Sequence, residues 1–200
     1  MANRGVQILG ARQPGRRASR RDELLSVAAD LFAERGFAGV TVDDIGAAAG
    51  VSGPALYHHF ESKEALLGEM LVSISESLLT KATTIVEVDS TRQALESLIA
   101  MHAEFAVDNR SLITVHFRDL VHATPADQRR VRELQNSYID IWVDVLSAER
   151  STSIPAPHER AAVHAVLGLI NSTPFSGRLR RDEMVSLLRT MAASALAATR

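Results

Sequence analysis

Residues 41–63 read TVDDIGAAAGVSGPALYHHFESK, and this stretch decides the fold. Thr41 is a helix-capping residue with two acids close behind it, and Gly50 ends the resulting short helix. Ser52 opens a second short helix, in which Pro54 is tolerated because first-turn amides lack intrahelical acceptors. Two very short helices around a Gly-Val-Ser turn are typical of a helix-turn-helix. The stretch therefore predicts a DNA-binding motif.

The apolar residues of the motif are spaced for packing between its two helices. Ile45, Ala48 and Leu56 fall where the helices must meet, and Val51 can fill the angle between them. We assign Phe60 to the core. The alternative that the residues leave open is a pair of ordinary short helices with a capped turn and no role in DNA binding.

The second short helix is predicted to present small and polar residues. Its first turn is small enough for the backbone to approach the floor of a major groove. Tyr57 can donate its hydroxyl to a phosphate, and Lys63 can place a positive charge beside it. Residues 53–55 are Gly, Pro and Ala and offer few hydrogen-bond donors, which favours contacts to phosphates and to an adjacent minor groove.

The N-terminal residues are strongly basic. Residues 1–21 contain six arginines and no acid, whereas the whole chain has a net charge of −2. A basic arm on an acidic body suits a protein that meets a polyanion at one end. The alternative is a solvated leader without such a role. We expect residues 1–18 to be a flexible basic arm.

The rest of the chain has apolar residues at helical spacing and no strand pattern. The sequence predicts nine helices and an all-α fold. The first three lie between Ser19 and Gly36, Thr41 and Gly50, and Ser52 and Phe60, and the other six cover about 63–86, 89–107, 111–122, 124–150, 158–172 and 181–199. A loop is expected over 151–157.

Composition excludes several classes of protein. The chain has no cysteine, so disulfides and thiolate chemistry are excluded. No apolar run is long enough to span a membrane, so we expect a cytoplasmic protein with no membrane partner. No Gly-rich phosphate loop, nucleophile elbow or metalloprotease motif is present, so we expect neither an enzyme nor a cofactor.

Residues 20–70 closely resemble the N-terminal domain of the TetR/AcrR family of transcriptional regulators. The family pattern is matched at Thr41, Ile45, Ala49, Gly50, Val51, Ser52, Leu56, Tyr57, His59, Phe60, Lys63 and Glu64. The preceding segment, from Ala28 to Phe37, resembles the family's first helix. One departure is Gly46, where the family usually has alanine.

This resemblance implies a nine-helix fold with a helix-turn-helix DNA-binding domain at 19–64 and an effector-binding and dimerisation domain at 65–200. It implies a homodimer through the last two helices, about 158–172 and 181–199. It also implies a repressor that binds near-palindromic double-stranded operator DNA and is released by a small, largely apolar effector. The alternative function is a helical protein-interaction module without specific DNA binding.

The residues expected to contact DNA come from the arm, the helix caps and the second short helix. They are Arg16, Arg17, Arg20, Thr41, Ser52, Gly53, Pro54, Ala55, Tyr57, His58, His59 and Lys63.

The residues expected to line the effector cavity are mainly apolar with a few polar side chains. They are Met101, His102, Phe105, His116, Phe117, Leu120, Tyr138, Trp142, His164 and Phe175. A metal held by histidines and carboxylates of these helices is the alternative. No pair has His-x-x-x-His spacing, so no metal is expected.

Overall fold

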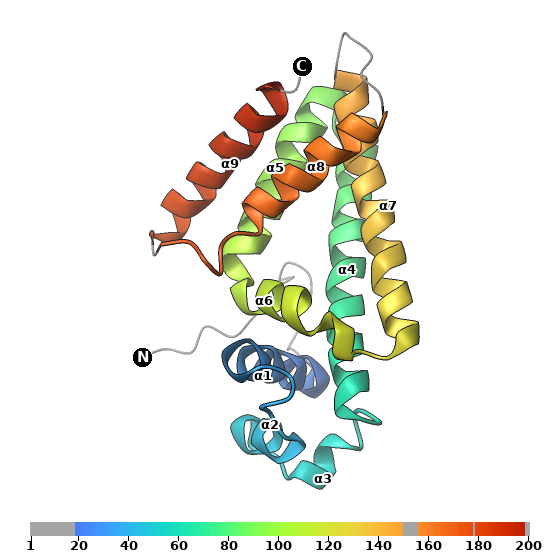
Figure 1. Cartoon of the computed structure of the whole chain (residues 1–200), viewed down its shortest axis with the longest axis vertical. Helices are drawn as coiled ribbons and strands as arrows, with labels where there is room; N and C mark the ends of the chain where they lie inside the picture. The colour runs from blue at the N-terminus through green and yellow to red at the C-terminus, as the bar shows by residue number, and fades with distance from the viewer. Residues whose placement is uncertain (1–18, 150–155, 178, 199–200) are drawn as a thin grey trace. The chain divides into compact units, whose positions relative to one another are not determined.

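The computed structural model describes residues 19–149, 156–177 and 179–198. Within these residues the regular elements are nine α-helices and one short 3-10 helix, with no strand (Figure 1). The predicted all-α fold is confirmed. None of the described helices is long and apolar enough to cross a membrane. The helices are α1 (Arg20–Arg35), α2 (Val42–Ala49), α3 (Gly53–Leu56), α4 (Lys63–Val88), α5 (Thr91–Asp108), α6 (Arg110–Asp119), η1 (Leu120–His122), α7 (Pro125–Glu149), α8 (Ala156–Ile170) and α9 (Arg181–Ala198).

Side-chain caps set where the first two helices begin. Ser19 and Thr41 each form a capping box, in which the side-chain oxygen accepts from the N–H three residues on and the acid there accepts from the cap N–H. Gly36 and Gly50 end these helices with φ angles of 78° and 69°, which glycine adopts without steric cost. The starts and ends predicted for both helices are confirmed.

Three local expectations are wrong. The Ser52 side chain makes no capping hydrogen bond, and α3 has only four residues. Ala48 lies on the exposed face of α2 and does not pack between the helices. Residues 156 and 157 were predicted to lie in a loop but belong to α8, which begins at Ala156 and takes Pro157 into its first turn, where no amide donor is required.

The chain forms two compact units. We call the described residues of 1–77 and 109–132 the N-terminal unit, and those of 78–108 and 133–200 the C-terminal unit. Helices α4 and α7 each contribute to both units. The N-terminal unit therefore contains α6 in addition to α1–α3. The three-part functional division expected from the sequence stays a prediction.

The N-terminal unit is built around α1. Helix α1 packs against α2 and α6, and α2 packs against α3. The buried side chains include Phe32 of α1, Ile45 of α2, Leu56 of α3 and, as predicted, Phe60. The short helices thus share one small apolar core, which is what holds a helix-turn-helix together.

One glycine in this unit permits a close helix contact. A Cβ placed on Gly68 of α4 would collide with the carboxylate of Asp127 in the first turn of α7. Asp127 in turn accepts a hydrogen bond from the Thr124 hydroxyl, which caps that turn by accepting from the Asp127 N–H. The missing side chain lets α7 begin against α4.

The C-terminal unit has a larger apolar core. Helix α5 packs against α9 and α8, and α8 packs against α9. Trp142 of α7 and Leu98 of α5 are fully buried in it, together with Val163 of α8 and Leu188 of α9. These are the helices in which the sequence predicts an effector cavity and a dimer interface.

Candidate nucleic-acid interface

The second short helix and the turn after it carry exposed polar side chains. Tyr57 is 56% exposed, and Ser52 and His58 are also exposed. Ala55 and His59 are half-buried. Since the Ser52 hydroxyl makes no capping bond, it is available to an outside acceptor. The structure therefore brings together Ser52, Tyr57 and His58 on one short stretch of accessible surface.

Two arginines at the start of α1 bind the ends of the motif helices. Arg20 donates to the carbonyl of Ala49, the last residue of α2, at 2.5 Å, and to Glu23 at 2.7 Å. Arg21 donates to the His59 carbonyl and makes a two-pronged contact with the carboxylate of Glu69. Carbonyls at helix ends lack intrahelical donors, so these guanidinium groups complete them.

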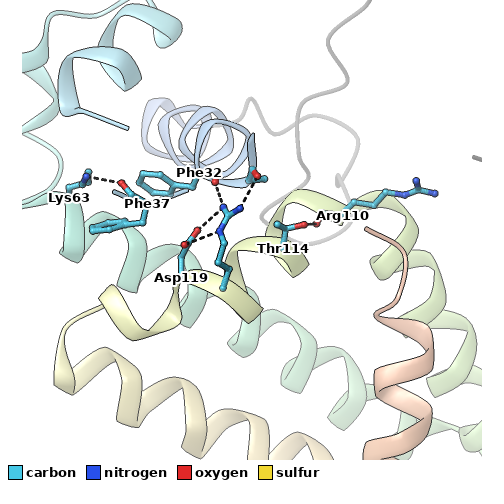
Figure 2. A network of polar contacts seen from close by, with 8 residues as sticks. Phe32, Phe37, Lys63, Arg110, Thr114 and Asp119 are labelled. Atoms are coloured by element: carbon cyan, nitrogen blue, oxygen red, sulfur yellow. Dashed lines mark hydrogen bonds and ion pairs between the residues drawn. The ribbon is translucent and has the colours of Figure 1, made fainter. Parts of the chain in front are cut away.

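Lys63 of α4 makes the same kind of contact with the α1–α2 connection. Its Nζ donates to the carbonyls of Phe37, at 2.8 Å, and Val40, at 2.7 Å, and lies 4.2 Å from the centre of the Phe37 ring (Figure 2). The sequence analysis predicted that Lys63 contacts a DNA phosphate and missed its hydrogen bonds within the protein. A lysine near the start of a helix can make either contact, and the sequence pattern does not distinguish them.

The other predicted DNA contacts are placed as follows. The Thr41 hydroxyl is committed to its own helix, because it accepts from the Asp44 N–H and donates to the Asp44 carboxylate. These bonds lower the pKa of Asp44. Arg16 and Arg17 lie outside the described residues, and of Gly53 and Pro54 only the backbone is described.

Helix α6 contributes contacts that sequence reasoning did not find. Arg118 donates to the carbonyls of Phe32 and Ala33 at the end of α1 and to the carboxylate of Asp119. The hydrogen bond to Asp119 raises the pKa of Arg118. His122 stacks on Phe37 with 5.0 Å between ring centres. None of these positions belongs to a local motif, so no sequence pattern indicated them.

Four of the predicted effector residues meet in the C-terminal unit. The Tyr138 hydroxyl donates to Nδ1 of His102 at 3.0 Å, and Nε2–H of His102 donates to Oδ1 of Asn171 at 3.1 Å. Trp142 lies edge-on to His102 with 6.1 Å between ring centres, and Phe105 is 5.9 Å from the same imidazole. We call His102, Phe105, Tyr138, Trp142 and Asn171 the aromatic cluster.

The aromatic cluster is neutral. Burial lowers the pKa of His102 to about 4 and raises the pKa of Tyr138. The Trp142 N–H is buried and makes no hydrogen bond of regular geometry within the described residues, but it lies close enough to the Tyr138 hydroxyl to oppose the rise of the Tyr138 pKa. A ligand that enters this cluster therefore meets hydrogen-bonding groups without formal charge.

The remaining predicted effector residues lie elsewhere. Phe175 is 82% exposed and His164 is exposed on α8, while Met101 is half-buried on α5. His116, Phe117 and Leu120 belong to the N-terminal unit. An open groove of about 600 Å³ between α5 and α9 is lined partly by charged side chains, including those of Glu96 and Arg189, and does not include the aromatic cluster.

The metal alternative has no geometric support in the part of the chain that the structure describes. No three histidine, aspartate or glutamate side chains there are grouped closely enough to hold an ion. The side chains of His102, Tyr138 and Asn171 are instead hydrogen-bonded to one another.

Helices α1, α2 and α3 together form what we call the head. Its glycine turn and the exposed tyrosine after its second short helix define a helix-turn-helix regulator. The chain belongs to the TetR family: residues 24–70 match the family described as bacterial regulatory proteins, tetR family, and residues 88–196 match the tetracyclin repressor-like C-terminal domain. The family consists of regulatory proteins, so the prediction of a regulator rather than an enzyme is confirmed.

Several relatives can be named. The HTH-type transcriptional repressor KstR2 of Rhodococcus jostii is 39% identical over 136 residues, an alignment that spans 66% of each chain. The structure of the ketosteroid transcriptional regulator KstR2 of Mycobacterium tuberculosis superposes with a TM-score of 0.72 at 26% identity, covering 92% of this chain and 96% of that one. A TetR-family regulator from Bordetella parapertussis shares the fold, with a TM-score of 0.78 at 22% identity over 88% of this chain and 95% of that one.

Proposed function

We propose that this protein is a transcriptional repressor that binds a near-palindromic operator as a homodimer and releases it when a small, largely apolar effector binds. The observation that carries the proposal is the accessible surface formed by Ser52, Tyr57 and His58 on a head that matches the family's DNA-binding domain. The curated relative from Rhodococcus jostii is named a transcriptional repressor, which supports this direction of regulation.

In this proposal the exposed side chains of Ser52, Tyr57 and His58 contact different parts of the DNA. The Tyr57 and Ser52 hydroxyls donate to phosphate oxygens and fix the register on the duplex. His58 reaches a base edge, since it is the remaining exposed polar side chain of the stretch. The predicted contacts of Arg16, Arg17, Arg20 and the other residues of the DNA-contacting set stay part of the proposal.

A duplex-binding titration tests it. The wild-type protein first selects duplexes from a random pool. The selected duplex is then titrated at about 50 and about 200 mM salt, because affinity that depends on phosphate contacts falls steeply between these concentrations. We expect affinity at least about a thousandfold above that for unselected DNA. Tyr57→Phe should weaken binding about three- to tenfold with an unchanged salt slope, because no charge is lost.

The matched control is Ser137→Ala, which also removes one hydroxyl, from an exposed position on α7. It should leave DNA affinity unchanged. If the wild-type protein enriches no sequence at either salt concentration, the repressor proposal fails. The helical protein-interaction module would then be favoured.

The dimer is proposed to form through α8 and α9. Helix α8 has three small exposed residues, namely Ala161, Ala165 and Gly168. A Cβ added to Gly168 would meet nothing within 4 Å. On α9, Leu187 and Met191 are 44% and 45% exposed. Large side chains of one copy against small ones of the other would give the close packing that a helical interface needs.

Sedimentation of two variants tests this interface. Ala165→Arg places a charge in the centre of the proposed contact and should convert the dimer to monomer at micromolar concentration. Gln93→Arg, at an exposed position of α5, is the control and should remain dimeric. A dimer that persists in Ala165→Arg would show that another surface holds the two copies together.

The effector is proposed to bind at the aromatic cluster. Its neutral donors and acceptors favour an apolar molecule with a hydroxyl or keto oxygen over a carboxylate. The Trp142 N–H supplies a buried donor for such an oxygen. The Mycobacterium tuberculosis relative is described as a ketosteroid regulator, a class that fits this chemistry.

Trp142 is the only tryptophan of the chain, so its fluorescence reports on this cluster directly. We expect a saturable change with androstenedione, a ketosteroid, and none with palmitate, an apolar carboxylate. Tyr138→Phe should weaken the ketosteroid response and leave DNA affinity without ligand unchanged. Coupling is reciprocal, so a steroid that binds equally well with and without the selected duplex is not the inducer.

A further inference from the structure

The end of α1 is held by a side chain that belongs to α6. The Arg118 guanidinium donates to the carbonyl of Phe32 and, at 3.3 Å, to that of Ala33. These carbonyls lie in the last turn of α1, and that of Phe32 also accepts from the N–H of Gly36, which ends the helix. A cation at this position also interacts favourably with the negative end of the helix dipole.

A buried carboxylate fixes the guanidinium in this orientation. Both Asp119 oxygens accept from Arg118, at 3.1 and 3.0 Å, and the Asp119 side chain is only 4% exposed. The Arg118 side chain itself is 43% exposed. A two-pronged contact of this kind restricts the fork to one direction, which here points at the α1 carbonyls.

The segment that follows α1 is held from two further elements. Lys63 of α4 donates to the carbonyls of Phe37 and Val40, and His122 of η1 stacks on the Phe37 ring. Helix α2 begins directly after this segment, at Val42. The end of α1 and the connection from α1 to α2 are therefore contacted by side chains of α4, α6 and η1.

We propose that Arg118 is a positioning residue for DNA binding: by fixing the end of α1 against α6, it sets the orientation in which α2 and α3 are presented to the duplex. The proposal rests on the proposed repressor function. Arg118 acts through the α1 carbonyls and does not touch DNA.

Helices α1 and α6 are also joined by a second contact, and this makes the role of Arg118 separable from folding. The Ser111 hydroxyl donates to the carboxylate of Asp30 at 2.8 Å. Ser111 lies in the first turn of α6 and Arg118 in its last. Removal of Arg118 leaves α6 docked at its first turn and frees the end of α1 to shift.

The test compares Arg118→Gln, Arg118→Lys and the control Ser111→Ala on the duplex selected by the wild-type protein. Binding is measured at 20 °C, under conditions where circular dichroism shows each variant folded. We expect Arg118→Gln to weaken binding about tenfold, Arg118→Lys to recover part of the loss, and Ser111→Ala to change it less than about threefold. The slope of affinity against salt should stay that of the wild type, because no phosphate contact is removed.

Three results would overturn the inference. The first is wild-type affinity in Arg118→Gln. The second is a reduced salt slope, which would mean that Arg118 contacts the phosphates itself. The third is a loss that merely follows the unfolded fraction of the variant, which would mean a structural role alone. A wild-type protein that selects no duplex contradicts the proposed function instead, and this result is seen before any variant is made.

Discussion

The interactions inside the N-terminal unit differ in chemistry from those inside the C-terminal unit. In the N-terminal unit, four cations donate to main-chain carbonyls at the ends of α1 and α2, in the connection between them and in the turn after α3; they are Arg20, Arg21, Lys63 and Arg118. In the C-terminal unit, the imidazole of His102 has neutral hydroxyl and amide partners, and the buried carboxylate of Glu159 accepts from the Ser147 hydroxyl.

The shortness of the motif helices accounts for part of the difference. The motif helices α2 and α3 have eight and four residues, so a large share of their carbonyls lies in last turns without intrahelical donors. Long side chains with several N–H groups satisfy such carbonyls from a half-exposed position. The helices of the C-terminal unit are longer, and the buried side chains of that unit are mainly apolar. The head is therefore braced by cations and the C-terminal unit by apolar packing.

The largest effect is expected from the core of the C-terminal unit. Trp142→Ala removes a fully buried indole and should lower the free energy of unfolding by about 3–5 kcal/mol. Urea unfolding followed by circular dichroism measures it. The control is Tyr57→Ala, which truncates an exposed aromatic and should change stability by less than about 0.5 kcal/mol. Equal losses would contradict the assignment of the two aromatics to core and surface.

The buried imidazole predicts a pH dependence for the C-terminal unit. The pKa of His102 is about 4 in the folded protein, against an ordinary value of 6.5, so below pH 6.5 the unfolded chain binds the proton more strongly. The free energy of unfolding is therefore highest above about pH 6.5 and decreases as the pH drops toward 4. On going from pH 7 to pH 5 it should decrease by about 2 kcal/mol.

The variant His102→Gln isolates this effect, because glutamine keeps an amide donor and acceptor but does not titrate. Urea unfolding at pH 7 and pH 5 should show a smaller loss in the variant than in the wild type, by about the same 2 kcal/mol. Identical pH profiles would mean that His102 binds its proton equally well in the folded and the unfolded protein.

The bracing of the head predicts a smaller effect at Lys63. Lys63→Met keeps the length of the side chain and removes both hydrogen bonds to the carbonyls of Phe37 and Val40, so we expect a loss of about 1–3 kcal/mol. Lys81→Met is the matched control, since Lys81 is half-buried on the same helix. Thermal unfolding of both variants checks the prediction, and indistinguishable midpoints would refute the brace.

The smallest effect is expected at Arg20. Its side chain is 43% exposed, so Arg20→Gln should cost no more than about 1 kcal/mol at low salt. The difference from the wild type should shrink in 0.5 M NaCl, a concentration at which the screening length is only a few ångströms, about 4 Å. Arg92→Gln, at an exposed position of α5, serves as control. A loss that salt leaves unchanged would place Arg20 in a less accessible contact.

The sequence by itself determined the helices, their order and the DNA-binding motif. Thr41, Gly50 and Phe60 have the roles assigned to them, because capping, positive φ and burial of a large apolar side chain depend on the residue and its near neighbours. The family resemblance rests on the same local spacing. It is confirmed by the match over residues 24–70 and 88–196.

Only the tertiary structure decided which side chains meet. His102 and Asn171 are far apart in the sequence and hydrogen-bonded in the fold, whereas Phe175, close to Asn171 along the chain, is exposed. Arg118 shows the same limit, since its carbonyl partners in α1 lie more than eighty residues away. Hydrophobic spacing identifies the buried face of a helix. It does not specify which residue of another helix faces it, because that depends on how the helices pack.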